Sequence, residues 1–142
     1  MEYVFDALLE PDPDGGFVVT FPDVSEAITA GETRQEALDN AKEALGLALR
    51  GIASLDRSLP KRGRHPGLVS VAVEAADALK LALVEAFRQS GLTKTEFGRR
   101  LGRTETEARR ILDPDHATKI ATMQAALALL GKSVVVSVRD AA

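Results

Sequence analysis

The sequence contains no cysteine and only two histidines, His65 and His116, among its 142 residues. Without cysteine the chain can form no disulfide, no cysteine-ligated zinc site and no thiol nucleophile, and two histidines argue against a histidine-rich metal centre. No run of apolar residues approaches the roughly 18 that a transmembrane helix requires. Residues 1–12 also lack the basic start and apolar core of a signal peptide. We therefore expect a cytoplasmic protein that uses no cofactor or metal and does not contact a membrane.

Charge is divided unevenly along the chain, whose formal net charge is -3. Residues 1–75 carry 13 acidic and 7 basic side chains, a net of -6, whereas residues 76–142 carry 8 acidic and 11 basic ones, a net of +3. Charge complementarity predicts a cationic partner for the first half and a polyanion for the second. The chain is long enough for two small domains, which we place at residues 1–74 and 75–142.

Residue patterns in the first half predict the element order β-β-β-α-β and an α+β fold. Residues 2–9 are rich in apolar and aromatic types, residues 17–21 alternate as a strand does, and a Pro/Asp/Gly-rich turn joins them into a hairpin. A short third strand is expected at residues 26–30. Residues 34–55 then show the three-four spacing of one apolar helical face, and residues 68–73 return to strand character. One helix therefore packs on a small sheet.

The second half is predicted to be helical until its last residues. An apolar stripe ends at Gly91, two short helices follow around the turn "LGR", and a further helix covers about residues 120–130. Two short helices around a tight turn that contains glycine are typical of a helix-turn-helix. Residues 134–138, with the sequence VVVSV, predict a short closing strand that could pair with a second chain.

Helix starts are marked three times by a threonine followed three residues later by a glutamate. In such a capping box the hydroxyl accepts from the third backbone amide, and the carboxylate accepts from the amide of the threonine. The three pairs are Thr33 with Glu36, Thr93 with Glu96, and Thr104 with Glu107.

The gathering of arginines on the two short helices favours DNA binding. The second helix of a helix-turn-helix enters the major groove by its N-terminal end, where arginine can bind guanine, glutamate cytosine and threonine the thymine methyl. Lysines at helix starts can contact phosphates. The candidate DNA-binding residues are Lys94, Arg103, Glu105, Thr106, Arg109, Arg110 and Lys119. The alternative is a helical bundle with solvated charges, because five acidic residues accompany the seven basic ones between residues 94 and 119.

Three carboxylates on or beside the predicted strands, Asp6, Glu10 and Asp23, raise the alternative of a small metal-dependent nuclease. Such an enzyme needs carboxylates that converge within a few ångströms, and the sequence does not indicate convergence. His65 lies in a loop rich in proline and glycine, where we expect a solvated side chain. The sequence therefore favours a protein without catalytic residues.

Residues 15–45 closely resemble the HicB antitoxin family. The matching positions include the Gly-Gly-Phe step at residues 15–17, Phe-Pro-Asp at 21–23, Thr-Ala-Gly at 29–31, and Glu-Ala-Leu at 36–38. Residues 92–132 look like the family variant that carries a C-terminal helix-turn-helix of the Cro/repressor type. Position 103 is often small and apolar in such motifs, so Arg103 either turns its side chain outward or requires a differently packed turn.

The resemblance implies a truncated ribonuclease-H-like first domain without working catalytic carboxylates. It also implies a HicA-type partner, a small basic toxin that cleaves mRNA, which the antitoxin binds and occludes. Operator DNA would be bound by a homodimer or tetramer that represses the shared operon. Candidate toxin-binding residues are the acids Asp23, Glu26 and Glu32, for which simple solvation is an equal alternative. A third reading is a stand-alone transcription factor whose first domain senses a small molecule.

Overall fold

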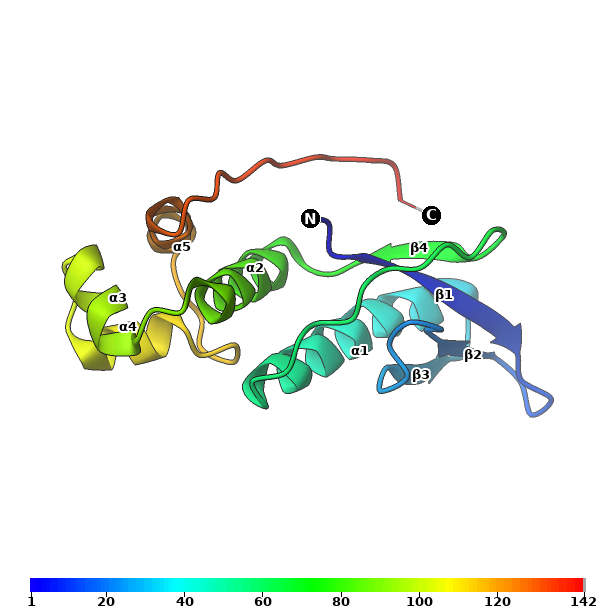
Figure 1. Cartoon of the computed structure of the whole chain (residues 1–142). Coiled ribbons are helices and arrows are strands. Elements are labelled where there is room, and N and C mark those ends of the chain that lie inside the picture. Colours follow the sequence, from blue (N-terminus) through cyan, green and yellow to red (C-terminus); the bar gives the residue numbers. More distant parts are fainter. Residues whose placement is uncertain (142) are drawn as a thin grey trace.

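The first half of the chain forms a four-stranded antiparallel sheet with one long helix packed against it. In the computed structural model, which describes residues 1–141, the strands lie in the order β3-β2-β1-β4. Their bounds are β1 Val4–Pro11, β2 Phe17–Thr20, β3 Ile28–Gly31 and β4 Val69–Ala72. Helix α1, Arg34–Ser54, follows β3 and precedes β4 in the sequence. It lies against one face of the sheet (Figure 1). The predicted order β-β-β-α-β is confirmed.

Helix α1 is held to the sheet by the apolar stripe that its sequence predicts. Leu45 and Leu49 have no exposed surface, and the alanines on the same face, Ala37 and Ala41, are also fully buried. Small side chains at these two positions let the helix backbone approach the strands closely. The face of α1 that packs on the sheet therefore combines two large apolar side chains with two small ones.

Gly31 allows the last residue of β3 to meet the first turn of α1. A Cβ atom at position 31 would collide with the backbone nitrogen of Ala37. Backbone cannot move aside as the end of a flexible side chain can, so only glycine fits at this junction. The Thr-Ala-Gly step noted in the sequence thus has a structural reason.

The second half consists of helices α2 Ala75–Ser90, α3 Lys94–Leu101, α4 Glu105–Ile111 and α5 Ile120–Leu129. Gly91 follows α2 with a positive φ of 74°, as expected for a glycine that ends a helix. Helix α2 packs against both α1 and α5, whereas α3 and α4 pack on each other. Within residues 1–141, no helix is both long enough and apolar enough to cross a membrane.

Two separate clusters of buried side chains form the interior, and α2 contributes to both. Leu81 belongs to the cluster between the sheet and α1. Leu83, two residues later, belongs to the cluster among the C-terminal helices. Residues two apart on a helix point to well-separated directions, so α2 presents one side to each cluster and joins the two halves.

The predicted capping boxes form only in part. At Thr104 both bonds are present, because its hydroxyl accepts from the Glu107 amide and the Glu107 carboxylate accepts from the Thr104 amide. Thr33 and Thr93 accept the expected backbone bond from the residue three positions on. The second bond, in which the glutamate carboxylate accepts from the amide of the threonine, was predicted at these two helices and is not formed there.

The predicted closing strand at residues 134–138 does not form in the single chain. After α5 the chain continues as an extended segment without strand pairing and runs back toward the side of the N-terminus (Figure 1). Val135, Val136 and Val138 are 88%, 78% and 92% exposed. A strand needs a neighbouring strand to satisfy its amides and carbonyls, and among residues 1–141 no strand pairs with this segment.

The burial of Leu45 predicts that α1 cannot tolerate a charge at this position. We expect Leu45→Asp to lower the free energy of unfolding by at least about 3 kcal/mol, because a carboxylate would replace a fully buried side chain. Chemical denaturation followed by circular dichroism measures this change. Leu47→Asp is the matched control, since Leu47 lies on the same helix and is 63% exposed. Equal stabilities of the two variants would contradict the packing described here.

Candidate nucleic-acid and protein-binding surfaces

Helices α3 and α4 pack closely because their contact is built from a small residue and a buried ring. A Cβ atom at Gly98 would lie 3.1 Å from the carbonyl oxygen of Arg103 and 3.2 Å from the Cβ atom of Ala108, so glycine permits this close approach. Phe97 is fully buried and meets Phe87 of α2 edge to face, with ring centroids 5.4 Å apart. The ring of Phe97 thus connects the helix pair to α2.

All seven candidate DNA-binding residues are exposed; six lie on α3, on α4 or in the turn between them, and Lys119 is the N-cap of α5. They are Lys94, Arg103, Glu105, Thr106, Arg109, Arg110 and Lys119. Exposure on the first turns of α4 is the placement that groove reading requires. DNA binding by these residues stays a prediction.

Glu105 and Arg109 are paired on the exposed face of α4. The Arg109 guanidinium donates to the Glu105 carboxylate at 2.8 Å, and this bond holds the pKa of Glu105 below its usual range. An ion pair one helical turn apart is weak in water, so Arg109 can exchange the carboxylate for a base or a phosphate, and Glu105 can accept from a cytosine amino group instead. Arg103 is exposed in the turn, which answers the question raised by the sequence: its side chain points outward.

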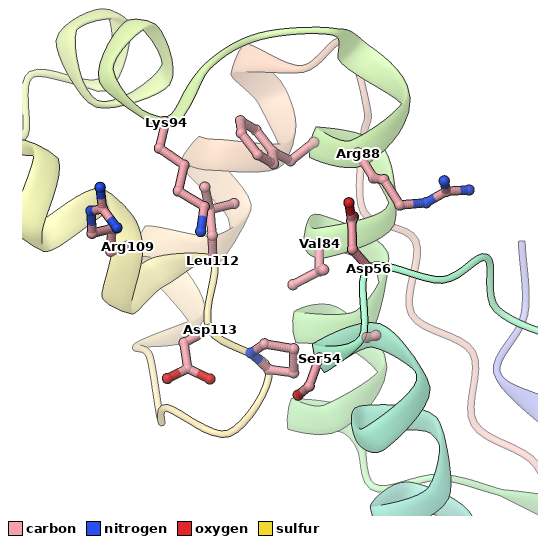
Figure 2. A pocket seen from close by; sticks show the side chains of 11 residues that line it. Ser54, Asp56, Val84, Arg88, Lys94, Arg109, Leu112 and Asp113 are labelled. Atoms are coloured by element: carbon pink, nitrogen blue, oxygen red, sulfur yellow. The ribbon is translucent and has the colours of Figure 1, made fainter.

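A pocket of about 500 Å³ lies where the end of α1 meets α2, α3 and α4. Lys94 and Arg109 line one side of it, together with the apolar side chain of Leu112, as Figure 2 shows. Asp56 and Asp113 contribute negative charge to the same lining. Because both signs of charge are present, the pocket has no marked preference for an anion or a cation.

The three candidate toxin-binding acids differ in their availability. Asp23 is already engaged within the chain, since its carboxylate accepts from the Gly63 amide at 2.7 Å and contacts the His65 ring at 2.9 Å. The Gly63 bond, followed by the His65 contact, lowers the pKa of Asp23 below its usual range. Glu26 and Glu32 are exposed. Their part in binding a protein stays a prediction.

Asp6 is the one buried carboxylate of β1, and a guanidinium and a backbone amide of the loop before β4 donate to it. Arg62 donates to its Oδ1 atom at 2.8 Å, and the His65 amide donates to Oδ2 at 3.3 Å. His65 thus joins Asp6 and Asp23, and the expectation of a solvated loop histidine was wrong. The sequence "PKRGRH" supplied a signal for this loop, but the pairing of its residues could not be read from it.

The nuclease alternative finds no support in this arrangement. Glu10 lies exposed near the end of β1, apart from the contacts that join Asp6 and Asp23. Within residues 1–141 no three His, Cys, Asp or Glu side chains gather closely enough to hold a metal ion. An arginine and a histidine take up the carboxylate oxygens that a metal would need.

Two further charged residues, which join separate helices and loops, were not identified from the sequence. Lys80 of α2 is only 4% exposed, and its ammonium donates to the Ile111 carbonyl oxygen at 2.7 Å. Arg50 of α1 pairs with Asp77 at 3.0 Å and with Asp115 at 3.3 Å. A signal for Lys80 existed, because it stands between two leucines in the apolar stripe of its helix.

Comparison with known proteins agrees with the resemblance seen in the sequence. Residues 5–85 match the family described as "HicB_like antitoxin of bacterial toxin-antitoxin system". The chain is 37% identical over 129 residues to "Antitoxin HicB" of Escherichia coli (strain K12), covering 89% of this chain and 92% of that protein. It is 31% identical over 142 residues to "Antitoxin HicB" of Pseudomonas fluorescens (strain Pf0-1), covering 99% and 95%.

A third relative, "Antitoxin HicB 1" of Photorhabdus laumondii, is 37% identical over 130 residues, covering 92% of this chain and 83% of that protein. These similarities extend over both the sheet-and-helix half and the C-terminal helices. They confirm the family assignment made from residues 15–45, and they confirm the expectation that the protein is not an enzyme. The chain belongs to the HicB-like antitoxin family of bacterial toxin–antitoxin systems.

Proposed function

We propose that the chain binds a HicA-type, mRNA-cleaving toxin through residues 1–74 and represses its own operon by binding operator DNA through residues 75–142. The observation that carries this proposal is the opposite charge of the two halves of one antitoxin chain, -6 for residues 1–75 and +3 for residues 76–142. A basic toxin and a nucleic-acid duplex are partners of matching sign. Both partners are found in the bacterial cytoplasm, where we place the protein.

Toxin neutralisation requires no chemistry from the antitoxin. We infer that residues 1–74 form a truncated ribonuclease-H-like module in which Arg62 pairs with the carboxylate of Asp6 and the His65 ring contacts the carboxylate of Asp23. Binding then blocks the toxin active site by occupying it, one antitoxin for each toxin. Exposed acids such as Glu26 and Glu32 add electrostatic attraction, which raises the association rate more than the final affinity.

Co-purification tests the toxin half of this proposal. We expect the full chain, expressed with the small toxin gene beside its own, to form a complex that survives size-exclusion chromatography. The double variant Glu26→Lys with Glu32→Lys should associate more slowly at low salt, roughly tenfold or more, because the attraction is reversed. Stopped-flow fluorescence at two salt concentrations measures the rate. Absence of any complex with the unaltered chain would remove the toxin from the proposal.

Operator binding is assigned to the helix pair α3 and α4, which we interpret as a Cro/repressor-type helix-turn-helix. Residues of the first turns of α4 would face base edges in the major groove, and Arg103 and Lys119 would contact phosphates. Arg110 is exposed near the end of α4, and no hydrogen bond engages its guanidinium in the described part of the chain. The guanidinium is therefore free to donate two hydrogen bonds to one guanine base.

The arginine at position 110 allows a direct test of DNA binding. We expect Arg110→Ala to weaken operator binding by about 1–3 kcal/mol if the guanidinium binds one base by two hydrogen bonds. Fluorescence anisotropy at fixed salt, with a duplex that covers the promoter of the chain's own operon, measures the affinity. Arg57→Ala is the matched control, because Arg57 is an exposed arginine in the loop after α1. Similar affinities for both variants would exclude Arg110 from the interface.

We propose further that two chains pair through their closing segments, residues 134–138. The exposed valines and unused backbone groups of this segment are those of a strand without a neighbour. Pairing of two such segments would join two DNA-binding halves, as a near-palindromic operator requires. A tetramer would arise if such dimers associate in turn.

A single proline substitution in this segment tests the pairing between two chains. Val136→Pro removes a backbone donor and should shift the mass measured by light scattering toward that of one 15.1 kDa chain. Val136→Thr keeps the backbone donor and a β-branched side chain, so it should retain the mass of the unaltered protein. If the proline variant assembles like the unaltered chain, the contact between subunits lies elsewhere.

A further inference from the structure

A buried ammonium group holds both ends of the loop that joins α4 to α5. Lys80 Nζ donates to the carbonyl oxygen of Ile111, the last residue of α4, at 2.7 Å. It also donates to the Thr118 hydroxyl at 2.6 Å, immediately before Lys119, the N-cap of α5. A third, longer contact of 3.5 Å reaches the carbonyl oxygen of Arg110. One side chain of α2 therefore sets the spacing between the end of α4 and the start of α5.

The middle of the same loop is tied to the first half of the chain. Arg50 of α1 donates to Asp115 of the loop at 3.3 Å and to Asp77 of α2 at 3.0 Å. The pair with Asp77 is about three-quarters buried on both sides, whereas Asp115 is 63% exposed. Arg50 thus links three parts of the chain: the toxin-binding module, the connecting helix and the loop behind α4.

Packing alone does not explain why residue 80 is a lysine. Its side chain lies in an apolar stripe where a leucine or methionine would pack without the cost of desolvating an ammonium ion. The cost is offset because the ammonium has acceptors on both sides, and because a cation at the end of a helix interacts favourably with the helix dipole. Hydrogen bonds have directions that apolar contacts lack, so the lysine specifies one orientation of α4.

We propose that Lys80 is a positioning residue for operator recognition, which fixes α4 relative to α5 so that the base-reading and phosphate-binding side chains fit one duplex together. Arg50 connects this arrangement to α1. The inference rests on the operator binding proposed above. Lys80 itself is too deeply buried to touch DNA.

The protonation of Lys80 offers a readout that simple loss of a surface charge would not produce. Burial lowers the pKa of Lys80 to about 8, and the Asp113 carboxylate opposes this shift. Lys80 also lines a second pocket, of about 270 Å³, and the other charged or titratable groups of its lining are Arg50, Asp77, Asp115 and His116. Above this pKa the ammonium becomes a neutral amine, and its bonds to the carbonyl oxygens weaken. Sequence-specific binding should therefore decline as the pH rises through about 8, where the exposed lysines and arginines remain charged.

Operator and shuffled duplexes of equal length, titrated with the full chain at fixed salt, test the proposal. The quantity of interest is the ratio of the two affinities. We expect Lys80→Met to lower this ratio about tenfold, comparable to the loss of one base contact, while toxin binding and affinity for the shuffled duplex are retained. Lys61→Met, which removes an exposed lysine of the loop after α1, is the control for the lost charge.

Thr118→Val removes one acceptor of Lys80 without changing the shape of the side chain, and it should lower the ratio in the same direction. If Lys80→Met shows no cooperative unfolding transition and is therefore not folded, the Thr118→Val variant alone tests the positioning role. The decline of the ratio between about pH 7 and about pH 9 should be present in the unaltered chain and absent in Lys80→Met. If the unaltered chain prefers the operator and both variants prefer it equally well, the positioning role is refuted and operator binding stands. If the unaltered chain shows no preference, operator binding fails, and the positioning role with it.

Discussion

Helix α2 is the element on which the rest of the structure depends, because it takes part in two hydrophobic cores. Leu81 completes the core beneath the sheet, and Leu83 begins the core of the C-terminal helices. Within residues 1–141, the packing of α2 on α1 is the main contact between helices that joins the two halves. The polar contacts of Lys80 and Arg50 lie along the same helix, so the orientation of the two halves is specified where their packing is shared.

Electrostatics divides the two halves as clearly as packing joins them. In the first half, the loop before β4 folds its basic groups onto Asp6 and Asp23, which leaves the surface acids to dominate the field outside. In the second half, the arginines of α3 and α4 remain at the surface. A chain with an overall charge of -3 can thus present faces of opposite sign to a basic protein and to a duplex.

Much of the fold could be predicted because its signals are local. The apolar period of residues 34–54, the alternation in β2 and the glycine after α2 each depend on a few neighbouring residues, and all were confirmed. The closing strand was predicted wrongly for the single chain, since strand formation depends on a distant partner. The return bonds predicted at Glu36 and Glu96 are also absent, whereas the one at Glu107 is formed.

The order of the helices and strands as far as α5, the family and the exposed arginines of the C-terminal helices could all be read from the residues alone, since periodicity and charge are properties of neighbouring residues. Which polar groups meet became known only from the folded chain. His65 reaches Asp23 across 42 positions, and Lys80 reaches Ile111 across 31. Such contacts depend on how helices and loops are oriented after packing, and no local pattern encodes the distance between two groups so far apart in the chain.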